Sequence, residues 1–167
     1  MSEPPSDPQP WYEDVVIPAL LRAARNAYAV AVRQALAMGD YEDMPANGPY
    51  LIGSIARSGA PLSQVIKELG VSKQAAGQLV DTLVLRGYLV REVDTVDRRR
   101  LTLTLTERGM GAHLASRAAV ERVDAKLAAR MAPAAISQGR AVLAALTLIG
   151  QEIEVEGPGG IETVAQA

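Results

Sequence analysis

The 167-residue chain has no cysteine and no phenylalanine, and its aromatic side chains are one tryptophan and five tyrosines. The lack of cysteine excludes disulfides, thiolate metal sites and thiol-based redox sensing, and it favours a cytoplasmic protein. No apolar run approaches the ~20 residues of a membrane helix, and the acidic, proline-rich start is unlike a signal peptide. We therefore expect a soluble, unexported protein whose core is built from Leu, Val, Ile and Ala, which suits packed helices.

The formal net charge of −2 is unevenly distributed along the chain. Residues 54–108 contain nine Lys and Arg and six Asp and Glu, whereas the remaining residues carry an excess of five negative charges. Because the distribution of charge decides whether a protein can bind a polyanion, the net acidity does not exclude nucleic acid as a partner.

The basic excess coincides with the most informative motif of the chain. A short helical pattern, SKQAAGQLVDTLVLRG, is followed by two strand patterns with an arginine-rich turn, YLVREVDTVDRRRLTLTLTERG. Leu101, Leu103 and Leu105 alternate with threonines, so leucines line one face of an extended strand. A helix followed by a cationic hairpin predicts a winged helix-turn-helix.

The rest of the chain has the apolar spacing of helices. From Ile17 to Met38 apolar residues recur at alternating steps of four and three, and we expect this helix to open near Asp14 and to end at Gly39. Shorter helices are predicted over 50–58, over 62–69 and after the N-cap Ser72, where the buried face would comprise Ala75, Ala76, Leu79, Val80 and Leu83. A long helix from Thr106 and a last helix after Pro133 complete the chain.

These patterns predict a mainly α fold with a small β-hairpin wing. We expect a disordered tail at 1–13, an N-terminal dimerisation helix at 14–45, a winged helix-turn-helix domain at 46–106, C-terminal dimerisation helices at 107–154 and a flexible tail at 155–167. The flanking helices exceed what a lone winged domain needs to cover its core. Their surplus apolar faces therefore predict a homodimer.

The predicted recognition helix carries polar residues on the face away from its leucines. Lys73, Gln74, Gly77 and Gln78 lie there, near the helix end that enters a major groove in helix-turn-helix proteins. Gln pairs with adenine and Lys with guanine, and a helix start capped by Ser72 favours a phosphate. Taken alone, these residues are equally well explained as ordinary solvated positions.

The turn formed by Asp97, Arg98, Arg99 and Arg100 favours DNA over that alternative. Adjacent arginines repel one another, which is costly in a tight hairpin unless an anion meets them. Asp97 can hold one guanidinium by a bidentate pair and so present the others outward. A solvated charged turn is the competing interpretation.

With these motifs, the chain resembles the MarR family of bacterial transcription regulators over about residues 14–152, most specifically in PLSQVIKELGVSKQAAGQLVDTLVLRGYLVREVDTVDRRRLTLTLTERG. The resemblance implies a bacterial cytoplasmic homodimer with interface helices from both ends of the chain. It also implies a repressor that binds a pseudo-palindromic site in double-stranded DNA and is released by a small, often aromatic, molecule.

The resemblance also assigns roles to individual residues. Asp97 and Arg99 match the wing pair in which the aspartate orients an arginine that enters the minor groove. Positions expected to contact bases or backbone are Ser72, Lys73, Gln74, Ala75, Gln78 and Arg91. Two departures are Gly77, where Ser or Thr is usual, and Arg100, where a smaller residue is common; they put the sequence preference in doubt.

Other functions have weaker support. Tyr28, Tyr50 and Met38, with Trp11 and Met44, would line an effector pocket if they are not simply core residues. His113 is the only histidine and is expected on a helix surface or interface, with no metal site or cofactor. No nucleophile elbow or phosphate-binding loop occurs, so an enzyme is not expected. The alternative function is a winged-helix protein interaction module without DNA binding.

Overall fold

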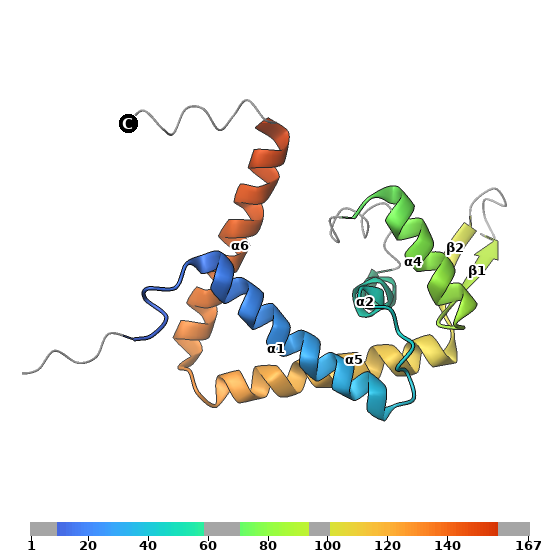
Figure 1. Ribbon diagram of the computed structural model, residues 1–167, viewed down its shortest axis with the longest axis horizontal. Helices are drawn as coiled ribbons and strands as arrows, with labels where there is room; N and C mark the ends of the chain where they lie inside the picture. The colour runs from blue at the N-terminus through green and yellow to red at the C-terminus, as the bar shows by residue number, and fades with distance from the viewer. Residues whose placement is uncertain (1–9, 59–70, 94–100, 157–167) are drawn as a thin grey trace, which may run out of the picture. The chain divides into compact units, whose positions relative to one another are not determined.

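The computed structural model describes residues 10–58, 71–93 and 101–156. The chain divides into two compact units, Met1–Val123 and Asp124–Ala167, and its elements follow in the order α1, α2, α4, β1, β2, α5 and α6 (Figure 1). Most described residues are helical, and the two strands pair in an antiparallel hairpin. The predicted fold class is confirmed. The helix predicted at 62–69 and the hairpin turn at 94–100 lie outside the described residues.

Helix α1 (Ile17–Met38) begins three residues later than the predicted start near Asp14. The preceding residues form turns instead, in which the Glu13 N–H donates to the Pro10 carbonyl at 2.9 Å. Val16 is the N-cap and Pro18 falls in the first turn, where a missing N–H removes no intrahelical bond. The helix ends at Gly39 as predicted.

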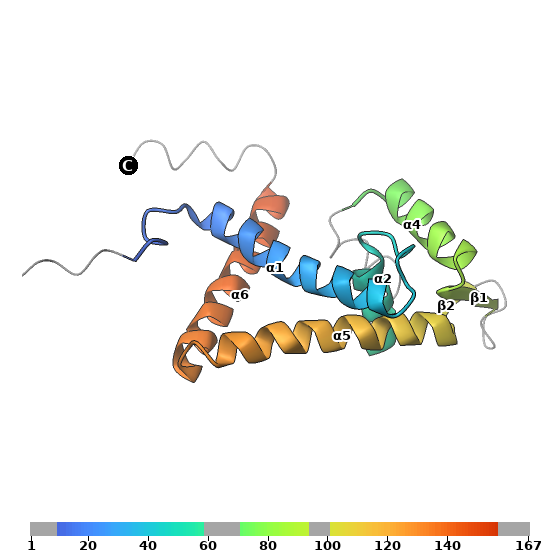
Figure 2. The same cartoon turned by 60° about the horizontal axis from the view of Figure 1, so that its bottom comes forward.

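Helix α2 (Gly48–Ser58) begins two residues before the predicted Tyr50, because Pro49 fits the first turn of a helix. Helix α4 (Lys73–Leu85) follows its predicted cap. Both helices pack with α1, α5 and the hairpin around one core (Figure 2). Its buried members are Leu36, Leu51, Ile52, Val80, Leu83, Tyr88, Leu89 and Ala112.

The face that α4 turns to this core is narrower than predicted. Ala76, Val80 and Leu83 are buried, and Leu79 packs against the core while half-buried. Ala75 is exposed, so its assignment to the buried face was wrong. It follows the N-cap in the first turn and lies outside the packed arc.

The hairpin joins β1 (Leu89–Val93) to β2 (Leu101–Leu105), with Leu89 opposite Leu105 and Arg91 opposite Leu103. Leu103 and Leu105 pack against the core while Thr102 is exposed, so the predicted alternation is confirmed there. Gly87, with φ of 74°, makes the tight passage from α4 to β1 in a conformation that favours glycine.

Helix α5 (Glu107–Ala128) turns its small residues, not its large ones, toward the core. The buried members are Gly109, Ala112, Ser116 and Ala119, whereas Met110 and Leu114 are 42% and 56% exposed. A Cβ at position 109 would lie 2.0 Å from the Tyr88 carbonyl oxygen, so only glycine allows this approach. The first turn of α5 is thereby held against the base of the hairpin, while Met110, Leu114 and Leu127 remain exposed.

Helix α6 (Pro133–Glu156) starts at the predicted proline. Its stretch Pro133–Ile153 has a mean hydropathy of 1.2 and is long and apolar enough to cross a membrane by length and composition, which corrects the expectation that no such stretch exists. This is weak evidence for a span, because a packed helix of a soluble protein passes the same test. Exposed residues on α6 include Val142, Leu143, Leu148, Ile149 and Ile153.

Candidate nucleic-acid interface and adjoining pocket

The N-terminal end of α4 presents a polar surface, and the opposite face of the helix is buried in the core. Ser72 has extended backbone angles, and its Oγ accepts a hydrogen bond from the Ala75 N–H at 3.2 Å, as expected of an N-cap. A Cβ added at Gly77 would meet no atom within 4 Å, so the space over the helix is open there. The exposed residues of this surface are Ser72, Lys73, Gln74, Ala75 and Gln78. The structure therefore brings the predicted α4 residues together on one accessible face.

Arg91 lies on β1 and is held beside α4 by a contact that the sequence did not reveal. Its guanidinium donates to the carboxylate of Asp81. The two side chains remain 42% and 66% exposed, so the pair stabilises the fold by at most about 1 kcal/mol. Its main effect is to hold the first strand of the wing in place beside the middle of α4.

The predicted wing-tip residues Asp97, Arg98, Arg99 and Arg100 lie outside the described residues, which resume at Leu101. The strands that flank them are paired from Leu89↔Leu105 to Val93↔Leu101. The roles of the four tip residues therefore stay predictions.

At the C-terminal end of α4 a polar cluster joins three distant segments. Tyr88, fully buried at the start of the hairpin, donates its hydroxyl to Asp43 Oδ1. Arg108 on α5 donates to the same oxygen at 2.8 Å and to the Tyr88 hydroxyl at 3.1 Å, and its guanidinium carbon lies 4.7 Å from the Tyr88 ring centroid. Arg86, the C-cap of α4, donates to the Asp43 carbonyl. Asp43 thus connects the segment between α4 and β1 with the first turn of α5.

The cluster changes the acidity of two of its members. The hydrogen bond from Tyr88, with hydrogen-bonding and charge from Arg108, holds the pKa of Asp43 below its ordinary value despite some desolvation. Burial raises the pKa of Tyr88, and its hydrogen bond to Asp43 raises it further. At neutral pH Asp43 is therefore an ionised acceptor and Tyr88 a neutral donor. Nothing in the local sequence around Asp43 points to partners this far along the chain.

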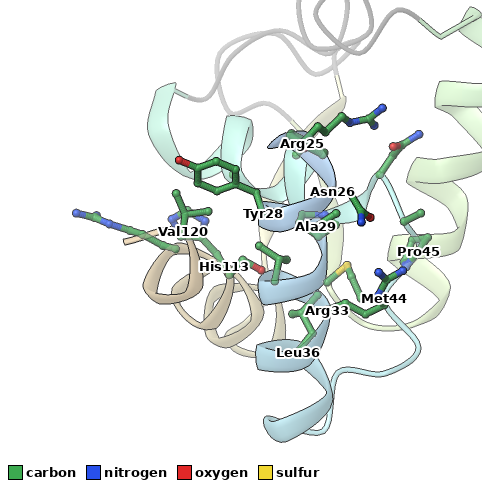
Figure 3. Close-up of a pocket in the computed structure, with 18 of the residues that line it drawn as sticks. Arg25, Asn26, Tyr28, Ala29, Arg33, Leu36, Met44, Pro45, His113 and Val120 are labelled. Carbon is green, nitrogen blue, oxygen red and sulfur yellow. The ribbon is translucent and has the colours of Figure 1, made fainter. Parts of the chain in front are cut away.

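A cavity of about 800 Å³ adjoins the same loop (Figure 3). It lies between α1, the loop before α2, α2 and α5. Tyr28, Tyr50 and Met44, which were predicted to line an effector pocket, all line this cavity, and their role in binding an effector stays a prediction. Met38 is not among the lining residues; it is the last residue of α1 and 88% exposed. Trp11 is 77% exposed and packs edge-on against Tyr12 instead.

The lining is strongly cationic, which the sequence prediction missed. Among the described residues it includes the five arginines Arg22, Arg25, Arg33, Arg57 and Arg117, against the single acid Glu42. Figure 3 shows Arg33 extending toward the loop that carries Met44 and Pro45, while Tyr28 points toward the α5 residues. The only available signal was that three of these arginines share a helix with Tyr28.

His113, which was predicted on a helix surface or interface, is half-buried and also lines the cavity. Its burial, with the charges of Arg117 and Arg57, lowers its pKa below the ordinary value, so the ring is neutral at physiological pH. Among residues 10–58, 71–93 and 101–156, no group of three or more potential ligands could hold a metal ion.

Comparisons with known proteins bear on this arrangement. Residues 43–100 match the family model of the MarR family. Streptococcus pneumoniae FabT in complex with DNA is 23% identical, with a TM-score of 0.69 over 81% of this chain and 96% of that one. Staphylococcus aureus MepR in a DNA complex is 17% identical, with a TM-score of 0.64 over 81% and 96%. Rhodococcus jostii CouR bound to p-coumaroyl-CoA is 24% identical, with a TM-score of 0.62 over 83% and 94%. No curated protein sequence matches.

Proposed function

The resemblance to MarR-family regulators is confirmed by the match over residues 43–100 and by the winged helix fold, and from this premise we propose a homodimeric, sequence-specific DNA-binding transcription regulator. The observation that carries the proposal is the surface of α4: Lys73, Gln74 and Gln78 are exposed at a capped helix start whose opposite face is buried. A helix fixed in this way can enter a major groove without rearrangement of its core. No catalytic step is part of the proposal.

In this proposal α4 reads bases and the hairpin adds backbone and minor-groove contacts. Gln74 and Gln78 have the amide geometry that pairs with adenine, and Lys73 can donate to guanine. Ser72 and the N–H groups of the first turn favour a phosphate. Asp97 would orient Arg99 toward the minor groove, with Arg98 and Arg100 on phosphates.

The dimer is proposed from apolar surface that the single chain leaves uncovered. On α1, Ile17 and Leu21 are 54% and 38% exposed, and large apolar residues along α5 and α6 are exposed as well. Several large exposed apolar side chains on helices of one chain are typical of an interaction site. A two-fold dimer would place two α4 helices in successive major grooves, about one helical turn apart, on a pseudo-palindromic site.

Regulation is proposed to act through the pocket, with a small molecule releasing a repressor from DNA in the cytoplasm. Glu42 and Met44 line the cavity, and Asp43 between them contacts the segment that joins α4 to β1 and the first turn of α5. A ligand that moves this loop would therefore alter the placement of the DNA-binding elements. The related CouR structure with p-coumaroyl-CoA supports a ligand role for this kind of fold.

The test begins with fragments of the genome of origin selected by their binding to the protein. Dissociation constants are then measured by fluorescence anisotropy for the wild type and for Lys73→Ala with Gln78→Ala. Each lost base contact should weaken binding by about 1–3 kcal/mol. Lys126→Ala with Gln34→Ala, two exposed helical positions elsewhere, is the matched control.

Arg99→Ala tests the wing in the same assay, with exposed Arg122→Ala as control. We expect a loss of about 1–3 kcal/mol with unchanged folding. If neither α4 nor wing variants differ from the wild type at any salt concentration, the DNA proposal fails and a protein interaction module becomes the better explanation. Sedimentation that shows a monomer at micromolar concentration would remove the dimer alone.

A further inference from the structure

The pocket beside α1 concentrates one sign of charge from three helices. Arg22, Arg25 and Arg33 come from α1, while Arg57 comes from α2 and Arg117 from α5. Like charges on one helix face destabilise it, and guanidinium groups gathered around a cavity repel one another across it. Such an arrangement is favourable when an anion occupies the space.

Within the described ranges, the protein itself does little to neutralise this charge. The ion pairs found there are Arg91 with Asp81, Arg108 with Asp43 and Arg117 with Glu121. Only Arg117 among the pocket arginines belongs to one of them, and Glu42 is the only acid among the described lining residues. The other four pocket arginines have no acidic partner among these ion pairs.

The positive groups are spread rather than clustered at one point. Arg22 and Arg33 are separated by roughly 16 Å along α1, at about 1.5 Å per residue. Arg57 comes from α2 and lies near His113 of α5, since a Cβ at Gly53 would be 3.6 Å from Arg57 Nη1 and 3.8 Å from His113 Nδ1. A single compact carboxylate cannot reach all of these groups at once.

The remaining lining offers an apolar surface of useful size. Tyr28, Val32, Leu36, Met44 and Val120 contribute apolar or aromatic groups. A volume of about 800 Å³ lies within the usual range for pockets that enclose a whole organic ligand.

We propose that this pocket binds an organic anion that carries at least two negative charges, carboxylate or phosphate, on an aromatic or acyl body. Arginine suits both groups because its planar fork donates two parallel hydrogen bonds to either. The ring or chain would lie against Tyr28 and Val120, with the charged ends toward α1 and toward Arg57. This proposal deepens the regulatory part of the proposed function and rests on it for the consequence of binding, but the binding itself is measured without DNA.

The test uses a charge series on one ring: benzoate, isophthalate and trimesate, which carry one, two and three carboxylates. Isothermal titration calorimetry on the full chain at low salt should show affinity rising by about tenfold or more with each added carboxylate, since each gains a charge-assisted hydrogen bond. Raising the salt concentration should shrink these steps.

The variant Arg25→Gln with Arg33→Gln should remove most of the charge dependence, while Arg122→Gln should retain it. Because His113 is the only histidine, its ring signals give a second readout by nuclear magnetic resonance. Bound trimesate should raise the His113 pKa by offsetting the arginine charge that lowers it, and benzoate should raise it less.

Equal affinity across the series, no binding of any probe, or a charge dependence unaltered in the double variant would each overturn the proposal. The DNA assays are independent of it. If trimesate binds with the expected dependence but no DNA fragment is selected, the ligand class stands and the proposed function fails. If DNA binding is specific but the probes do not bind, the proposed DNA-binding function stands and the proposed ligand class fails.

Discussion

Helix α4 and the loop before α2 differ in how far apart in the sequence their stabilising contacts lie. The α4 surface depends on contacts three or four residues apart, such as the Ser72 cap on the Ala75 N–H and the Thr82 hydroxyl donating to the Gln78 carbonyl. Asp43 in the loop finds Tyr88 and Arg108 at 45 and 65 residues along the chain. The proposed DNA-binding surface of α4 therefore depends on contacts between near neighbours in the sequence, while the cluster around Asp43 forms only when the whole unit folds. Substitutions in the two regions should have different first effects.

The largest effect is expected at Tyr88, the buried member of the long-range cluster. Tyr88→Ala should lower the free energy of unfolding by about 3–5 kcal/mol, because it empties a fully buried aromatic site. Urea unfolding followed by circular dichroism measures this, with Tyr50→Ala, at a tyrosine that is 51% exposed, as the matched control.

Tyr88→Phe separates the hydroxyl from the ring and should cost about 1–2 kcal/mol, since it removes one donor to Asp43. If Tyr88→Ala unfolds no more easily than Tyr50→Ala, the cluster is not part of the stabilising core and the contrast with α4 collapses.

A smaller effect is expected at the local cap. Ser72→Ala should destabilise the protein by about 1 kcal/mol, because the Ala75 N–H loses its acceptor. Ser137→Ala in α6 is the control, since that serine is exposed inside a helix where alanine is favourable. The cap variant should also bind DNA more weakly if Ser72 contacts a phosphate. A cost equal to that of the control would show that the cap is dispensable.

Gly77→Ala should act in the opposite direction. Because a Cβ at position 77 meets no atom within 4 Å, alanine should raise the free energy of unfolding by about 0.5–1 kcal/mol through its helix propensity. Gly139→Ala, at an equally open helical position, should raise it similarly. If only Gly77→Ala weakens DNA binding, close backbone approach to DNA explains the glycine; lower stability would instead reveal an unseen contact.

The smallest effect concerns pH. The pKa of Asp43 is lower in the folded state than its ordinary value of 3.8, so its contribution is present above pH 3.8 and is lost as pH falls through the folded value. Since the Asp43 side chain is 44% exposed, the contribution should stay below about 1 kcal/mol. Stability measured between about pH 3 and 6 should fall less on the acid side in Asp43→Asn than in the wild type; parallel curves would contradict this.

The elements that could be predicted are those with a local cause. The Ser72 cap, the stop at Gly39 and the leucine side of β2 follow from neighbours within a few residues. The start of α1 was placed too early, near Asp14, and the residues around it form turns instead. The α4 residues proposed for DNA lie on one face, while the wing-tip residues remain untested.

The pocket could be anticipated only in part. Tyr28 and Tyr50 were assigned to it from aromatic character, but Arg25, Arg57 and His113 come from different helices and share no sequence motif. Likewise, Met110 and Leu114 have the spacing of a buried face, yet Ala112, Ser116 and Ala119 are the residues that pack inward. Small side chains permit the closer approach of backbones, and hydrophobicity patterns under-weight them.

The fit between Gly109 and the Tyr88 carbonyl has a mechanical consequence. Thr106 reinforces it, because its hydroxyl donates to the Gly87 carbonyl at 2.6 Å and its N–H to the Tyr88 carbonyl at 3.2 Å. Because this contact leaves no free space between α5 and the base of the hairpin, a rotation of the first turn of α5 about the helix axis should move the hairpin with it.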